Sequence, residues 1–113
     1  MNNFRIEETP GSRDGVTVLR LSGPFTLGAV FDFQSTVRNH RAPFTIVDLT
    51  GVPYMDSAAL GSVLGFHVSC QRDSRHYALV GVSDRLRTMF KVAGVSDLLV
   101  MRDSIDHAES VLN

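Results

Sequence analysis

The sequence has a single cysteine, no tryptophan and no excess of either charge. Because Cys70 alone cannot form an intramolecular disulfide, a disulfide-stapled secreted scaffold is excluded, and we expect a reducing, cytoplasmic setting. Eleven Lys and Arg stand against 12 Asp and Glu, a formal charge of -1, which gives no electrostatic reason for direct nucleic-acid binding. No stretch approaches the roughly 20 apolar residues that cross a bilayer, so we expect no membrane insertion.

Signatures of catalysis and of cofactor binding are also missing. The histidines are scattered along the chain, and Cys70 has no partner at zinc-ligand spacing: His40, His67, His76 and His107. We expect His67 and Cys70 to be packed side chains rather than a ligand and a nucleophile. The phosphate-loop, dinucleotide-binding and nucleophile-elbow patterns are absent. The sequence therefore predicts no metal, no cofactor and no enzymatic activity.

Hydrophobic residues make up 43% of the 113 residues, enough for one folded domain over residues 1–113. Alternating residues 4–8 and 16–21 flank turn-forming Pro10-Gly11 and Asp14-Gly15, a pattern that predicts a hairpin. Three further strands are predicted, the first two as buried apolar runs: residues 44–49, 77–80 and 98–101.

Four helices are predicted between and after these strands. The first is capped by Thr26, the second begins at Asp56–Ser57, and the last runs from Asp103 or Ser104 to Val111. The third begins at Ser83 or Asp84 and ends at Gly94. In the first and third helices the expected core-facing residues are Val30, Phe31, Phe33, Val37, Leu86, Met89, Phe90 and Val92. The order β-β-α-β-α-β-α-β-α predicts an α/β fold with a mixed, mainly parallel sheet.

The most informative segment is DLTGVPYMDSAALGSVLG, residues 48–65. It combines the end of a buried strand with an Asp-Ser pair that opens an apolar helix. On physical grounds Asp56 or Ser57 is a helix cap, and Ser57→Ala would then lose one cap bond of about 1 kcal/mol. Alternatively, Ser57 is a phosphoserine at an interface, because a helix start tolerates anionic charge that a bound partner would not. No basic residue stands beside this pair in the sequence.

Tyr54-Met55-Asp56-Ser57 and Leu60-Gly61 resemble the signature of STAS domains, the anti-sigma factor antagonists of bacterial partner-switching systems. The resemblance continues at Val80-Gly81-Val82-Ser83 and from Leu86 to Val95, and it extends over nearly the whole chain. It implies a STAS-like mixed sheet with an N-terminal hairpin.

The resemblance also implies a mechanism. Ser57 would be the phosphoacceptor, and Asp56, Met55, Leu60 and Gly61 would join it in binding the partner. That partner would be an anti-sigma factor that is itself a serine kinase; a serine phosphatase would reset the switch. Core packing is an equal alternative for Met55 and Leu60, and for Gly61 close helix packing is the favoured interpretation.

The chain departs from the family signature at three places: Ala58 replaces a second serine, Ala59 replaces a glycine, and Thr26 replaces an aspartate. Two alternatives to the antagonist remain open. One is a STAS scaffold or transporter accessory subunit that binds without phosphorylation, and the other is a small nucleotide-binding protein or enzyme that uses the helix start. The oligomeric state is left open.

Overall fold

A four-stranded mixed sheet forms the centre of the computed structural model, which describes residues 3–39 and 42–110. The spatial order is β1-β2-β3-β4, which is also the order along the chain: β1 (Arg5–Pro10), β2 (Val16–Ser22), β3 (Phe44–Gly51) and β4 (His76–Val80). Strands β1 and β2 pair antiparallel, whereas β2–β3 and β3–β4 are parallel. The predicted hairpin and mainly parallel sheet are thereby confirmed.

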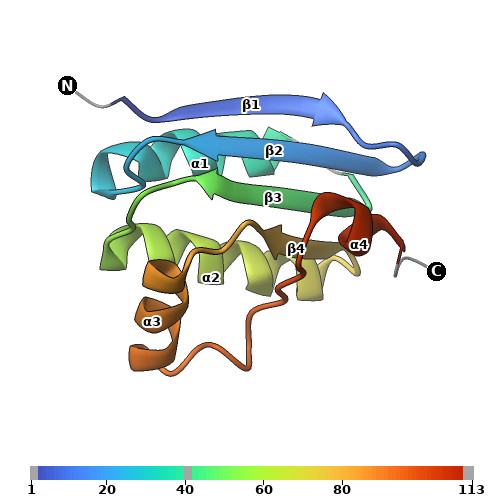
Figure 1. Ribbon diagram of the computed structural model, residues 1–113. Coiled ribbons are helices and arrows are strands. Elements are labelled where there is room, and N and C mark those ends of the chain that lie inside the picture. Colours follow the sequence, from blue (N-terminus) through green and yellow to red (C-terminus); the bar gives the residue numbers. More distant parts are fainter. Residues whose placement is uncertain (1–2, 40–41, 111–113) are drawn as a thin grey trace.

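Helices cover both faces of this sheet (Figure 1). Helices α1 (Leu27–Asn39) and α2 (Ser57–Arg72) pack on one face, followed along the chain by α3 (Asp84–Val92). Helix α4 (Ile105–Ser110) packs on the other face. Because successive strand residues point to opposite faces, Val47 and Leu49 enter the larger core under α1 and α2, and Ile46 enters the smaller one under α4.

The predicted strand at residues 98–101 is wrong. Only Met101 pairs with the sheet, through an isolated parallel bridge to Leu79. The preceding residues are drawn into a turn, since the amides of Leu98 and Leu99 both donate to the carbonyl of Val95. The amide of Val100 donates to the Tyr77 hydroxyl instead of to a neighbouring strand. The amides that a fifth strand would use for sheet pairing are instead bonded within a local turn and to the Tyr77 side chain.

Two residues predicted to face the core are exposed. Phe31 is 73% exposed because Phe33 takes the inward position, and residues two apart on a helix point about 200° apart. Val92 is 84% exposed at the last position of α3. The predicted endpoint of the last helix, Val111, lies outside the described residues. No helix in the described part of the chain is long and apolar enough to cross a membrane.

Candidate partner-binding site at the start of helix α2

Two connections, one before α1 and one before α2, meet at the carboxyl end of the sheet. Phe25 and Met55 form an isolated parallel bridge. The Phe25 amide donates to the Tyr54 carbonyl at 3.1 Å, and the Asp56 amide donates to the Phe25 carbonyl at 3.1 Å. The starts of both helices are therefore fixed relative to one another by backbone bonds.

The Asp56 carboxylate strengthens this junction because each of its oxygens accepts from a different helix. Asp56 is the N-cap of α2, with Oδ1 accepting from the Ala59 amide at 2.9 Å. Its Oδ2 accepts from the Leu27 amide, at the first residue of α1, also at 2.9 Å. The predicted capping role is confirmed, whereas the bond to the second helix was not predicted.

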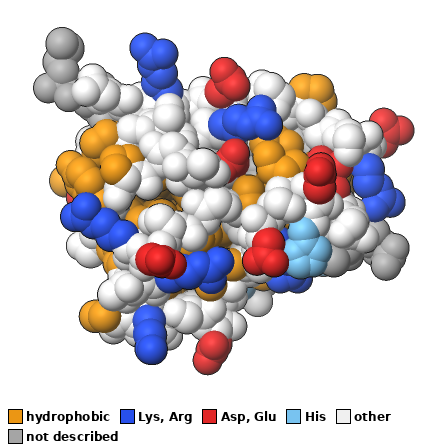
Figure 2. Space-filling model, viewed as in Figure 1, with side chains coloured by type: hydrophobic (Ala, Val, Ile, Leu, Met, Phe, Trp, Pro, Cys, Tyr) orange, Lys and Arg blue, Asp and Glu red, His pale blue; other side chains and the backbone are white. Residues whose placement is uncertain are grey.

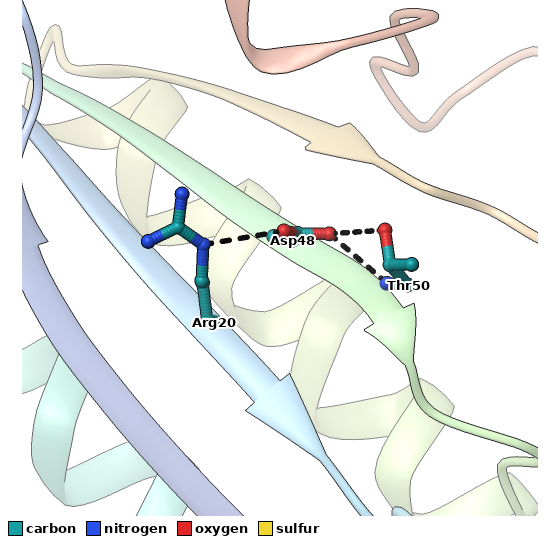
Figure 3. Close-up of polar contacts among 3 residues, drawn as sticks. All are labelled: Arg20, Asp48 and Thr50. Carbon is teal, nitrogen blue, oxygen red and sulfur yellow. Dashed lines mark hydrogen bonds and ion pairs between the residues drawn. The ribbon is translucent and has the colours of Figure 1, made fainter.

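A polar cluster holds the strand that leads into this junction (Figure 3). Asp48 Oδ1 accepts from both the amide and the hydroxyl of Thr50, and Oδ2 pairs with Arg20 Nε at 3.6 Å. The pairing of β2 with β3 shifts register just beyond Arg20–Asp48, the signature of a bulge. The cluster thus stabilises the bend by which β3 turns toward Asp56.

Ser57 is the first residue of α2 and its side chain is exposed. Within the described residues its hydroxyl makes no hydrogen bond, because Asp56 performs the capping. The expectation that Ser57→Ala would lose a cap bond is therefore wrong. At the start of a helix the first amides have no intrahelical partner, so those of Ser57 and Ala58 are available near the hydroxyl.

A groove of about 470 Å³ runs between the start of α2 and α3. Its walls are formed by Tyr54, Met55, Asp56 and Ser57 on one side and by Arg85, Leu86, Thr88 and Met89 on the other. Arg85 stacks over the Tyr54 ring, with the guanidinium carbon 5.3 Å from the ring centroid. A cation therefore shares the groove with Ser57. Arg85 was not predicted as a site residue, since 28 positions separate it from Ser57 and only the fold brings the two together.

The remaining predicted site residues separate into buried and exposed positions. Met55 and Leu60 are 7% and 6% exposed and belong to the larger core. Gly61 is exposed, and a Cβ added to it would meet no atom within 4 Å. Close helix packing is therefore not the reason for this glycine. Its bare backbone leaves a flat surface one turn from Ser57.

Exposed apolar side chains extend this surface. Leu27 and Phe31 are 70% and 73% exposed and lie one turn apart on α1, and Tyr54 is 39% exposed. Figure 2 shows hydrophobic side chains gathered at the end of the molecule where α1 and α2 begin. Sequence periodicity missed this patch because it assigned Phe31 to the core.

The histidine and cysteine of α2 lie toward its opposite end. His67 and Cys70 are 5% and 2% exposed, which confirms that both are packed side chains. Burial raises the pKa of the Cys70 thiol, with a smaller lowering by Arg75 and a smaller raising by Asp73. A buried thiol with a raised pKa is a poor nucleophile at neutral pH.

Residues 9–108 match the STAS domain family model. An anti-sigma-B factor antagonist of Listeria monocytogenes is 39% identical over 57 residues, half of this chain and half of that protein. An anti-sigma-B factor antagonist of Staphylococcus aureus is 26% identical over 107 residues, covering 92% of this chain and 97% of that one.

A similar fold occurs in the solved structure of the Bacillus cell fate determinant SpoIIAA in its phosphorylated form. The TM-score is 0.71 at 19% identity, covering 96% of this chain and 99% of that one. The hairpin, the parallel sheet and the family match lead to one conclusion: this chain belongs to the STAS domain family.

Proposed function

We propose that this protein is an anti-sigma factor antagonist controlled by phosphorylation of Ser57. Unmodified, it binds an anti-sigma factor that is also a serine kinase; phosphorylated, it is released, and a serine phosphatase restores it. The exposed Ser57 hydroxyl, unbonded within the described residues at the mouth of a groove, carries this proposal. The Listeria and Staphylococcus relatives, named anti-sigma-B factor antagonists, and the phosphorylated SpoIIAA structure support it.

The geometry around Ser57 accommodates a phosphate without unfolding the helix. A phosphoserine adds about -1.5 to -2 charges, and the positive end of a helix dipole and its free amides stabilise such charge. Arg85 supplies a cation in the same groove. Asp56 is the opposing charge, and it keeps its place because both of its oxygens accept backbone amides. Phosphorylation therefore changes the surface and leaves the fold intact.

The same surface is suited to a protein partner. Leu27, Phe31 and Tyr54 offer exposed apolar area, and Gly61 allows a partner backbone to approach α2 closely. Burial of exposed apolar area is the main favourable term in most protein–protein association. Met55 and Leu60 hold the shape of this surface from below, and Asp56 holds its two helix starts together. A phosphate on Ser57, in the groove that Tyr54 also lines, would need to be desolvated in the complex, which opposes binding.

Phosphate transfer to Ser57 is tested by incubating the protein with ATP, Mg²⁺ and each candidate anti-sigma kinase of its own organism, followed by intact-mass analysis and peptide mapping. We expect a single phosphate on Ser57. Ser57→Ala should abolish the modification, whereas Ser22→Ala, at an exposed serine on β2, should leave it unchanged. Phosphate on another residue, or none with kinases shown to be active, contradicts the proposal and favours a scaffold that binds without phosphorylation.

A further inference from the structure

A second cavity, of about 340 Å³, lies at the far end of α2 from Ser57. Its wall combines the end of α2, the beginnings of β3 and β4, and the segment after α3: Phe44, His67, Cys70, Gln71, Arg75, His76, Tyr77, Ala78, Val100 and Arg102. Ten residues of helix separate Ser57 from His67, a distance of about 15 Å along the axis. This cavity is therefore distinct from the groove beside Ser57.

The cavity exists because β4 lies at the edge of the sheet. Among the described residues, the segment that follows α3 makes backbone–backbone hydrogen bonds to β4 only at Leu79, whose amide donates to the Val100 carbonyl and whose carbonyl accepts from the Arg102 amide. At Tyr77, two residues earlier, β4 pairs with β3 on one side, and on its other side the described chain contains no neighbouring strand. Side chains from both faces of the sheet reach around this open edge, among them Tyr77 from one face and Phe44 from the other.

A buried hydrogen-bond chain ends at this cavity with one group unused. The Val100 amide donates to the Tyr77 hydroxyl at 3.1 Å, and that hydroxyl lies 2.7 Å from His67 Nδ1. Because Tyr77 already accepts from Val100, its own proton is available for Nδ1, and the imidazole then carries its hydrogen on Nε2. His67 is 5% exposed, and its Nε2 has no hydrogen-bond partner among the described residues. An unsatisfied buried donor is costly, and a bound acceptor removes that cost.

The charged side chains that line the cavity, Arg75 and Arg102, are both cationic, and its described lining contains no acidic residue. His67 and His76 add imidazole nitrogens to the same lining. Arg75 pairs with Asp73 at 3.5 Å, and Asp73 lies outside the lining. Arg102 gives one guanidinium hydrogen bond to the Met101 carbonyl, and an arginine has five such donors. Phe44, Ala78 and Val100 give the cavity an apolar wall, and Gln71 adds a side-chain amide to the lining.

We propose that this cavity binds a small organic carboxylate. The apolar wall would hold its hydrocarbon part, and Arg102 and His67 would donate hydrogen bonds to its carboxylate. A cavity of this volume is at the lower end of those that enclose small molecules, which limits the ligand to about the size of an aromatic or six-carbon acid. The site does not depend on phosphorylation of Ser57.

The proposal is tested by NMR titration of the isotopically labelled full chain with benzoate and with hexanoate, and with the neutral twins benzamide and hexanamide. We expect at least one carboxylate to shift the His67 and Tyr77 ring signals saturably, with a Kd of about 1 mM or lower, and its amide to bind at least ~10-fold more weakly. Saturable thermal stabilisation by the same carboxylate should accompany these shifts.

Arg102→Gln should weaken carboxylate binding by about 10-fold. Arg5→Gln, at an exposed arginine on β1, is the matched control and should bind as the wild type does. His67→Gln is a second variant that removes the buried imidazole, and a preserved far-ultraviolet dichroism spectrum shows whether each variant is folded. The proposal is overturned if neither carboxylate gives a saturable shift up to ~20 mM, if the amides bind equally well, or if folded Arg102→Gln binds like the wild type.

Discussion

The two ends of helix α2 use their polar groups in opposite ways. At its amino end the Asp56 carboxylate is fully engaged by backbone amides, and the Ser57 hydroxyl beside it is exposed and unbonded within the described residues. At its carboxyl end His67 is buried, with one nitrogen bonded to Tyr77 and the other without a partner in the described chain. We propose that a protein partner binds at the first end and a small carboxylate at the second.

The comparison separates residues that stabilise the fold from residues that are available for binding. Asp56 and Ser57 are adjacent in sequence, yet Asp56 stabilises two helix starts and Ser57 is exposed to a partner. Tyr77 and Val100 are far apart in sequence but belong to one buried hydrogen-bond chain. Substitutions at the two ends of α2 should therefore differ in their effect on the free energy of unfolding.

Replacing Asp56 by Ala should lower the free energy of unfolding by about 2–3 kcal/mol. It removes the cap of α2 and, in addition, a charged acceptor for the first amide of α1. Ser57→Ala is the matched control and should change stability by less than about 0.5 kcal/mol, because its side chain makes no bond within the described residues. Urea unfolding of both variants gives the comparison, and equal losses would contradict the double role of Asp56.

At the other end of α2, Tyr77→Phe should cost about 2 kcal/mol. The change leaves the Val100 amide without its acceptor and His67 Nδ1 without its partner, in a buried environment. Tyr54→Phe provides the control, since the Tyr54 ring is partly exposed and its hydroxyl makes no hydrogen bond with a described residue. If the two variants unfold at the same urea concentration, the buried chain from Val100 to His67 contributes nothing to stability.

Gly61→Ala should raise the free energy of unfolding by roughly 0.5–1 kcal/mol, because alanine favours helix and the new methyl group meets open space. Gly81→Ala is the opposite case: its φ is +67° and its Cβ would meet Thr50 and Asp48, so stability should fall. If Gly61 serves the partner surface, the stabilised Gly61→Ala protein will also bind the anti-sigma factor more weakly. Thermal unfolding and binding measured on the same samples test both statements.

The smallest effect concerns alkaline pH. Burial raises the pKa of the Tyr77 hydroxyl, an effect that the Val100 hydrogen bond partly offsets, and burial also raises the pKa of the Cys70 thiol. Because both groups hold their protons more tightly in the folded state, their contribution to stability is complete below the ordinary pKa values and is lost as pH rises above about 9. In a denaturant series from pH 7 to 11, Cys70→Ala should lose stability less steeply than the wild type just above about pH 9. Identical curves would contradict the role of Cys70.

The sequence predicted what depends on neighbouring residues. An Asp-Ser pair before an apolar helical run predicted a cap at Asp56 or Ser57, and two alternating segments around glycine turns predicted the hairpin. Contacts between distant segments could not be predicted from local sequence. Arg85 lines the groove beside Ser57 only because of the fold, and the Leu27 amide donates to an Asp56 that is 29 residues away. The strand predicted at residues 98–101 is wrong for the same reason: the Val100 amide donates to the hydroxyl of Tyr77, 23 residues away, and not to a neighbouring strand.

For the site residues too, local sequence order was predictive, whereas features that depend on the folded structure were not. The Asp-Ser pair was recognisable from its order and spacing, but whether each residue was a cap or an exposed hydroxyl depended on which side chain reached the Ala59 amide. Periodicity placed Phe31 inside because it could not tell which of two nearby phenylalanines the sheet would accept. Gly61 gave no local sign that the space around it was open.

The central claim, that a phosphate on Ser57 ends partner binding, is tested most directly by calorimetry. The anti-sigma kinase that modifies this protein is titrated with the unmodified chain and with the chain carrying one phosphate on Ser57, both in ADP and Mg²⁺. A phosphate in the groove that Ser57 shares with the partly exposed Tyr54 should weaken binding by at least ~100-fold, about 2.7 kcal/mol. Equal affinities for the two forms would contradict the account.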